Sequence, residues 1–439
     1  MFIGKGNYLR AIFLVCLQCI KRESFKIPVL SFLLQATSMT LGFVTSFLLA
    51  RALGSSGYGE YTYIFAWAIL AASCLSACFD KMLTRQFARH IATGEREEGL
   101  LRGLWQIAWV SVCTVSLLGV LLCGVFAFWE GTLYRSSLPF FALMSVPLLA
   151  MGQIGQALVR GRGLVILAQV PDLLIRPLGL LLGVVICFCI DELSPSVVGK
   201  FQLVGIGLSF ALTYYWVYQL ARHWRAAFQY DWASWLPSFR WFALLGIVGL
   251  LNNRIDVLML GYLGDSASVG IYNIAARFSD MLKMPLVAVN AVLAPQFAAL
   301  FAQQKFEDIQ KVARLHSWAA LGIGFFIFVL FVLGGKYFLS CFGRDFIRGY
   351  GVLLLLSAGQ LVNLACGSVG NVLQMSGYDK YVFWGVAWAC LLQIILNYCL
   401  IPIWGIYGGA MASAVSVIFW NAFLTVVLKN KMNIRTSVW

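Results

Sequence analysis

Apolar runs of about twenty residues recur along this chain with only short polar segments between them. An α-helix needs roughly 20 predominantly apolar residues to cross the hydrocarbon core of a bilayer. Because 61% of the 439 residues are hydrophobic and only 11% are charged, a soluble globular protein is close to excluded. We predict an all-α polytopic membrane protein with about twelve spans, at 27–50, 61–79, 104–128, 138–159, 164–190, 201–220, 241–263, 271–300, 317–340, 351–375, 381–402 and 404–428.

Basic residues are distributed unevenly among the loops that these spans leave. With the N-terminus placed inside, 22 of the 32 Lys and Arg residues fall in cytoplasmic segments and six in outer loops. Basic residues resist translocation, so this bias predicts a multi-pass protein with both termini in the cytoplasm. The net charge of +14 is thereby explained by topology. We find no RNA- or DNA-binding motif with interleaved aromatic residues and expect no nucleic-acid partner.

The two halves of the chain share a motif. LLARALGSSGYGEY at 48–61 follows the first span, and VLMLGYLGDSASVGIY at 257–272 follows the seventh. Aligning their Leu-Gly pairs places Gly59 opposite Gly270, with one inserted residue. Chance recurrence of a Leu-Gly turn is the alternative to a true repeat. A repeat predicts two six-helix halves in parallel orientation, with the substrate site at their interface, as in many transporters.

The segment before the first span is too short to cross a membrane. Residues 8–20 are apolar, are flanked by basic residues and lack a small-residue cleavage site, so we predict an interfacial helix. The chain then divides into a cytoplasmic or interfacial N-terminal segment, a six-helix bundle, a cytoplasmic linker, a second six-helix bundle and a cytoplasmic tail, at 1–26, 27–222, 223–240, 241–428 and 429–439.

Seven charged residues fall inside the predicted spans. Each costs about 2.5 to 3.5 kcal/mol at the bilayer centre on insertion scales, so they must face one another or a water-filled cavity. They are Asp172, Arg176, Arg254, Asp256, Arg277, Asp280 and Lys283.

Asp172 and Arg176 stand at i and i+4, on one face of a helix, where they can form an ion pair. Such a pair can simply tie helices together. Pro171 and Pro177 bracket it, however, and predict a locally broken helix of the kind that lines a cavity. Both interpretations stay open at this point.

The other five charges lie in the seventh and eighth spans. Asp280 is three residues from both Arg277 and Lys283 and can neutralise either. Arg254 and Asp256 are two residues apart and point to different sides of a helix, so they cannot pair well.

Basic residues outnumber acidic ones by four to three among these seven. Arg51 and Arg85, near the ends of the first two spans, would raise the positive charge further if they lined the same cavity. A positive cavity suits an anionic substrate, and guanidinium groups bind phosphate through two parallel hydrogen bonds.

No catalytic constellation is visible. The chain has no Walker loop, no Ser-His-Asp set and no metal-ligand cluster, and its three histidines lie in predicted cytoplasmic loops. We therefore expect neither an enzyme nor a bound cofactor or metal. If transport is coupled to protons or sodium, the candidate groups are Asp172, Asp256 and Asp280.

Several stretches resemble polysaccharide transporters of the multidrug/oligosaccharidyl-lipid/polysaccharide (MOP) exporter superfamily, in the branch that includes O-unit flippases of the Wzx type. Together they cover nearly the whole chain in order. They are LLARALGSSGYGEYTYIF from residue 48, NNRIDVLMLGYLGDSASVGIYNIAARFSDMLKMPLVAVNAVLAPQFAAL at 252–300, VLQMSGYDKY at 372–381 and LNYCLIPIWGIYGGAMASAVS at 396–416.

This resemblance implies two six-helix bundles that form a V around a central cavity open alternately to each side. It also implies a flippase that moves polyprenyl (undecaprenyl) diphosphate-linked oligosaccharide across the bacterial inner membrane for O-antigen or capsule synthesis. The implied partners are this lipid-linked oligosaccharide, membrane lipids, and a polysaccharide polymerase and glycosyltransferases. We expect a monomer, because two bundles enclose a site within one chain.

Charged cavity residues are the ones implicated in transport by such flippases. Arg254 and Asp256 lie inside the matched motif and are the firmest candidates. Arg51 also lies in a motif, where a role in shaping the turn is the alternative, and Asp80 ends the second span. Arg277 and Asp280 follow Tyr272, whereas Asp172, Arg176 and Lys283 rest on the cavity argument alone.

Two other functions remain open on sequence grounds. The first is another exporter of the same superfamily, namely a lipid II flippase, an exporter of a different polymer or a cation-coupled multidrug antiporter. A strongly acidic aromatic pocket would favour the antiporter, and the positive membrane interior argues against it. The second is a scaffold for glycosyltransferases and polymerases, which would gain nothing from buried charges.

Overall fold

The computed structural model describes residues 23–93, 98–129, 137–190, 194–222, 224, 227–434 and 436. All regular secondary structure in these ranges is helical, which confirms the predicted all-α class. The interfacial helix predicted at 8–20 lies outside the described residues.

The first half of the chain opens with a helix that folds back on itself. In α2 the backbone turns at Gly54, whose φ of 68° is readily adopted only by glycine, so two of the predicted spans form one continuous element. The elements of this half are α2 (Glu23–Thr93), α3 (Glu98–Trp129), α4 (Leu138–Gly161), α5 (Val165–Val170), η2 (Pro171–Ile175), α6 (Arg176–Ile190) and α7 (Pro195–Ala221).

The second half contains two helices that the apolar pattern predicted to be continuous. The spans predicted at 271–300 and 351–375 are each broken, and that part of the prediction was wrong. Pro285 lacks a backbone N–H and accompanies the first break, and Gly367, at a φ of 73°, makes the second. The elements are α8 (Trp232–Leu263), α9 (Ser266–Met281), α10 (Met284–Ala302), α11 (Phe306–Ser340), η3 (Arg344–Gly349), α12 (Tyr350–Cys366), α13 (Val369–Met375), α14 (Asp379–Trp404) and α15 (Ile406–Met432).

Nine helical segments within the described ranges are long and apolar enough to cross a membrane. One of them, Ile27–Phe87, contains two predicted spans because of the bend at Gly54. With α8 and the pair α9 and α10, all twelve predicted spans fall on helices. The chain is therefore a multi-pass membrane protein.

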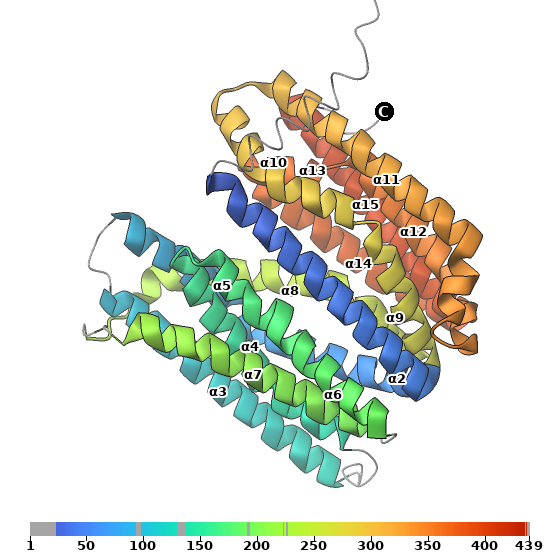
Figure 1. The fold of residues 1–439 in the computed structure, drawn as a ribbon. Coiled ribbons are helices and arrows are strands. Elements are labelled where there is room, and N and C mark those ends of the chain that lie inside the picture. The colour runs from blue at the N-terminus through green and yellow to red at the C-terminus, as the bar shows by residue number, and fades with distance from the viewer. Residues whose placement is uncertain are drawn as a thin grey trace, which may run out of the picture.

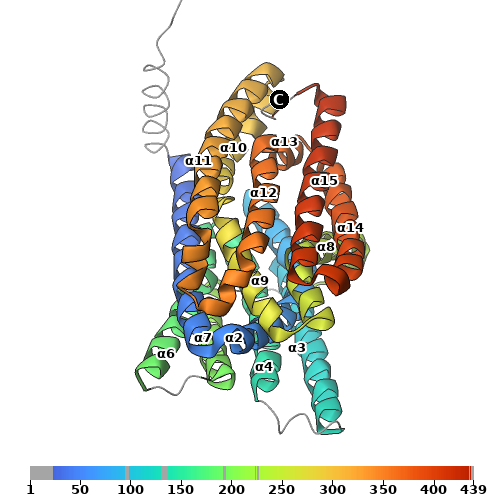
Figure 2. The same cartoon turned by 90° about the vertical axis from the view of Figure 1, so that its right-hand side faces the viewer.

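The helices form two groups. In Figure 1, α3 to α7 make up one group and α9 to α15 the other, and α2 and α8 run between them. Helix α2 contacts both groups, and α8 contacts α2 and the second group. Figure 2 shows the same arrangement from the side. The end of the bundle with Glu23 and Met432 is called here the terminal end, and the end with the α2 bend is called the kink end.

The two groups pack tightly against each other at the kink end. The largest apolar cluster joins Tyr58 of α2 to Tyr272 of α9 and Phe346 of η3. Phe43 of α2 makes edge contacts with Phe278 and Phe342, with ring centroids 5.0 and 5.5 Å apart. The core that joins the two halves therefore lies at this end, and it closes the interface there.

Candidate substrate cavity

A cavity of about 830 Å³ lies at mid-depth and is called here the central cavity. Side chains from both arms of α2 and from α8, α9, α10, α12, α14 and α15 line it. Five of the charged residues singled out from the sequence lie in its wall: Arg254, Asp256, Arg277, Asp280 and Lys283.

Two of these residues, Arg254 and Arg277, are arginines that take no part in the ion pairs of the described residues. Arg277 donates from Nε to Oδ1 of Asn273 at 3.3 Å, and its guanidinium lies against α2, where a Cβ on Gly42 would be 3.3 Å from Nη1. Arg254 interacts electrostatically with two like charges, Arg277 and Arg176, and with the carboxylate of Asp280. Like charges held close together favour the entry of an anion.

Asp280 and Lys283 form an ion pair where α9 gives way to α10. The Nζ of Lys283 lies 2.6 Å from Oδ1 of Asp280, and the side chains are 39% and 49% exposed. The i and i+3 spacing of these residues allows an ion pair, and the structure contains it. Asp280 therefore pairs with Lys283 and not with either arginine, although its carboxylate still interacts electrostatically with Arg254.

Asp256 is held entirely by neutral groups. Its carboxylate accepts hydrogen bonds from Tyr272 Oη at 2.8 Å, Gln393 Nε2 at 2.7 Å, Asn397 Nδ2 at 2.9 Å and Ser413 Oγ. Asn397 is fully buried, and within the described part of the chain its Oδ1 has no hydrogen-bond partner. A carboxylate next to an unused amide oxygen offers a place for a proton or a small cation.

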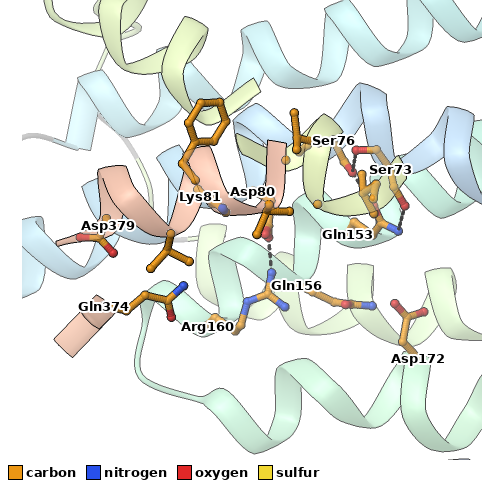
Figure 3. Close-up of a pocket in the computed structure, with 18 residues that line it drawn as sticks. Ser73, Ser76, Asp80, Lys81, Gln153, Gln156, Arg160, Asp172, Gln374 and Asp379 are labelled. Atoms are coloured by element: carbon orange, nitrogen blue, oxygen red, sulfur yellow. Dashed lines mark hydrogen bonds and ion pairs between the residues drawn. The ribbon is translucent and has the colours of Figure 1, made fainter. Parts of the chain in front are cut away.

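A second cavity, of about 940 Å³, lies toward the terminal end and is called here the mouth cavity. Arg160 lies in the last turn of α4 and Asp379 is the first residue of α14, so both halves of the chain contribute to its wall. Figure 3 shows Arg160 in an ion pair with Asp80 of α2. Leu250 lines both cavities, which therefore adjoin.

Asp172 also faces the mouth cavity. Its Oδ1 lies 3.7 Å from Nη1 of Arg176 and accepts a hydrogen bond from Ser209 Oγ at 3.3 Å. The helix break predicted around Pro171 takes the form of a single π-helical turn, η2, inserted between α5 and α6. Such turns occur often at functional sites. Arg176 lines neither cavity.

Arg51 and Arg85 lie outside the lining of both cavities. Both are exposed, Arg51 just before the bend at Gly54 and Arg85 one turn beyond Lys81. The structure therefore does not bring these two residues together with the other charges, and they add nothing to the positive charge of the central cavity.

Sequence reasoning missed Arg160, which lies one residue beyond the span predicted at 138–159, and the neutral polar residues of both cavities. Gln153, Gln156 and Arg160 share one face of α4 at i, i+3 and i+7, a spacing that could have been noticed in an apolar span. Gln393 and Asn397 stand four residues apart on α14 in the same way. An uncharged polar side chain is less costly inside a membrane span than a charged one, so the uncharged residues were not selected as candidates.

Solved structures with this fold are membrane transporters. An inward-facing multidrug resistance MATE family transporter of the MOP superfamily superimposes with a TM-score of 0.72 at 11% identity, covering 90% of this chain and 94% of the other. The lipid II flippase MurJ, in an inward closed conformation, gives 0.69 at 14% identity, covering 91% and 87%. A MOP superfamily transporter from Pyrococcus furiosus, described with a binding pocket of reversed polarity, gives 0.63 at 13% identity, covering 95% and 97%.

The fold is thus one that solved membrane transporters share. Residues 29–301, more than half of the chain, match the family described as polysaccharide biosynthesis protein. The chain belongs to this family. Residues 247–399 also match the MatE family. Among curated proteins, no sequence matches the chain.

Proposed function

We propose that this protein is a flippase for polyprenyl diphosphate-linked oligosaccharide repeat units in the bacterial inner membrane, where it serves the synthesis of surface polysaccharide. The observation that carries the proposal is the pair Arg254 and Arg277 in the central cavity, neither of which forms an ion pair within the described residues. Two guanidinium groups match the charge and the geometry of a diphosphate.

The positions of the two cavities support a route for the substrate across the membrane. The mouth cavity leads from the terminal end toward the central cavity, and the kink end is packed shut. The excess of basic residues in the terminal-end loops supports a cytoplasmic location for that end. The lipid-linked headgroup enters there, the arginines hold its diphosphate at mid-depth, and separation of the halves at the kink end releases it to the periplasm. The polyprenyl tail stays in the bilayer.

Asp256 is the group that we assign to energy coupling. Its four neutral donors and the unused Oδ1 of Asn397 suit exchange between a carboxylate, a carboxylic acid and a bound sodium ion. Entry of a cation here changes the charge of the same cavity that holds the diphosphate. We expect the working unit to be a monomer, served by membrane-bound glycosyltransferases and a polysaccharide polymerase.

The alternative is another MOP exporter, such as a lipid II flippase or a cation-coupled multidrug antiporter. The MatE match and the MATE and MurJ folds keep this alternative in view. The central cavity has three basic and two acidic side chains, an imbalance that disfavours a cationic drug.

Genetic complementation tests the proposal. The chain is expressed in bacteria that lack their own O-unit flippase, using several strains with different repeat units, and surface polysaccharide is measured. We expect restoration in at least one strain and its loss with Arg254→Ala. If no strain is restored by a well-inserted protein, the proposal is wrong, and drug-efflux and lipid II assays then decide between the alternatives.

A further inference from the structure

A row of uncharged polar side chains lines the α4 side of the mouth cavity. Gln153 donates from Nε2 to Ser73 Oγ at 3.2 Å and accepts a hydrogen bond from Ser76 Oγ at Oε1. Figure 3 shows these side chains beside one another, with Gln156 further along the same wall. The row fixes the orientation of the Gln153 amide inside an otherwise apolar bundle.

Gln156 is the member of the row whose hydrogen-bonding capacity is unused. It is 5% exposed and lines the cavity, yet its Nε2 has no hydrogen-bond partner among the residues that the structure describes. A buried amide left without a partner is unfavourable, so most such groups are paired in folded proteins. In the view of Figure 3, Gln156 lies between Arg160 and Asp172, and all three residues line the mouth cavity.

The two cavities differ in charge. The mouth cavity has two basic and three acidic side chains in its wall, whereas the central cavity has three basic and two acidic ones. A diphosphate therefore prefers the central cavity. The mouth cavity also carries hydroxyl and amide groups, Ser73, Ser76, Gln153 and Gln156, which suit a ligand group that both donates and accepts hydrogen bonds.

We propose that the mouth cavity is the sugar-recognition subsite, in which Gln153 and Gln156 hydrogen-bond the hydroxyl groups of the oligosaccharide whose diphosphate lies at Arg254 and Arg277. The inference rests on the proposed function and adds to it the residues that choose the sugar. A glutamine amide is both donor and acceptor, as a sugar hydroxyl is. The cavities adjoin at Leu250, so one ligand spans both.

Size is consistent with this assignment. The volume of about 940 Å³ is near the upper end of the range of roughly 300 to 1,000 Å³ found for small-molecule sites. Sites built to hydrogen-bond a hydroxyl group discriminate strongly against ligands that lack it, because their buried polar groups are then left unpaired. The row at Gln153 and Gln156 therefore supplies selectivity that the two arginines, which contact only the diphosphate, do not.

The test compares binding of lipids with and without sugar. The purified full chain is titrated in detergent with undecaprenyl diphosphate, and with undecaprenyl diphosphate carrying one hexose or one N-acetylhexosamine. We expect the wild type to bind at least one glycosylated lipid more tightly than the bare one. Gln156→Leu and Gln153→Leu each reduce that preference about 3- to 10-fold, the value of one hydrogen bond, and leave binding of the bare lipid unchanged.

Gln202→Leu is the matched control. Gln202 is 8% exposed, lies in the same half of the chain and lines neither cavity, so its substitution leaves the preference unchanged. Size-exclusion profiles establish that each variant is folded.

Three outcomes separate the inference from the function on which it rests. If Gln156→Leu and Gln153→Leu keep the full wild-type preference, the sugar subsite is elsewhere and the inference is overturned. Equal wild-type affinity for the bare and both glycosylated lipids overturns it as well. If the wild type binds none of these lipids, the proposed function itself fails.

Discussion

Gly59 and Gly270 lie back to back where the two halves of the chain meet at the kink end. A Cβ on Gly59 would be 1.6 Å from the carbonyl oxygen of Ser266, and a Cβ on Gly270 would be 2.2 Å from that of Ser55. These are the two glycines that the internal sequence repeat aligns. The contact is therefore nearly reciprocal, with each half presenting the same position of the same motif to the other.

We predict that Gly59→Ala or Gly270→Ala prevents the kink end from closing. The added methyl group meets backbone, which cannot move aside as a flexible side chain could. Transport in the complementation assay falls to less than about a tenth of wild type. This loss corresponds to a closed state destabilised by about 1.4 kcal/mol or more relative to the open state. Gly207→Ala is the control, because a Cβ there meets nothing within 4 Å. Normal transport by both alanine variants would show that this contact does not need to close.

Arg277 is predicted to bind the diphosphate directly. Arg277→Ala weakens binding of undecaprenyl diphosphate by about 10- to 100-fold, since a hydrogen bond to a charged group contributes about 1.5 to 3 kcal/mol. Titration of the purified protein measures this change. Arg51→Ala, which removes an exposed arginine outside both cavities, leaves the affinity unchanged. An equal loss of affinity in the two variants would mean that the net charge of the protein, and not a binding site at Arg277, determines binding of the lipid.

Asp256 is predicted to couple transport to an ion gradient. Asp256→Asn preserves the shape of the side chain and removes its charge, so transport in proteoliposomes no longer responds to an imposed proton or sodium gradient. Asp256→Ala is also less stable, because it leaves several buried donors unpaired at about 1 to 3 kcal/mol each. Thermal unfolding measures the second effect. A gradient response that survives in Asp256→Asn would move coupling to another group.

The terminal end is predicted to be cytoplasmic. Alkaline phosphatase is active only outside the cytoplasm, so a fusion after the last residue is inactive and a fusion after Gly264, between α8 and α9 at the kink end, is active. Enzyme assays on whole cells distinguish the two. The opposite pattern would invert the topology and the direction of transport.

The number and type of elements could be predicted because a bilayer requires apolar runs of a set length. The span predicted at 138–159 and helix α4 differ by two residues at one end. Breaks within spans were harder to predict. The apolar pattern continues across Leu282 and Gly367, and it does not report where a helix loses its backbone hydrogen bonds.

The candidate site was only partly predictable for a related reason. Charges inside spans are expensive, so Arg254 and Arg277 could be identified from the sequence alone. The hydrogen-bond partners of Asp256 could not be predicted, since its bonds to Gln393 and Ser413 join residues more than a hundred positions apart. Spacing along one helix says nothing about which helices lie beside it.

Movement of the lipid-linked oligosaccharide across a bilayer tests the central claim most directly. Proteoliposomes with the wild type, Arg254→Ala or Arg85→Ala are loaded with an undecaprenyl diphosphate-linked oligosaccharide that supports complementation, and its appearance in the opposite leaflet is measured with a membrane-impermeant glycosidase. The account predicts transport by the wild type and Arg85→Ala and none by Arg254→Ala. Wild-type rates in a correctly inserted Arg254→Ala protein would contradict it.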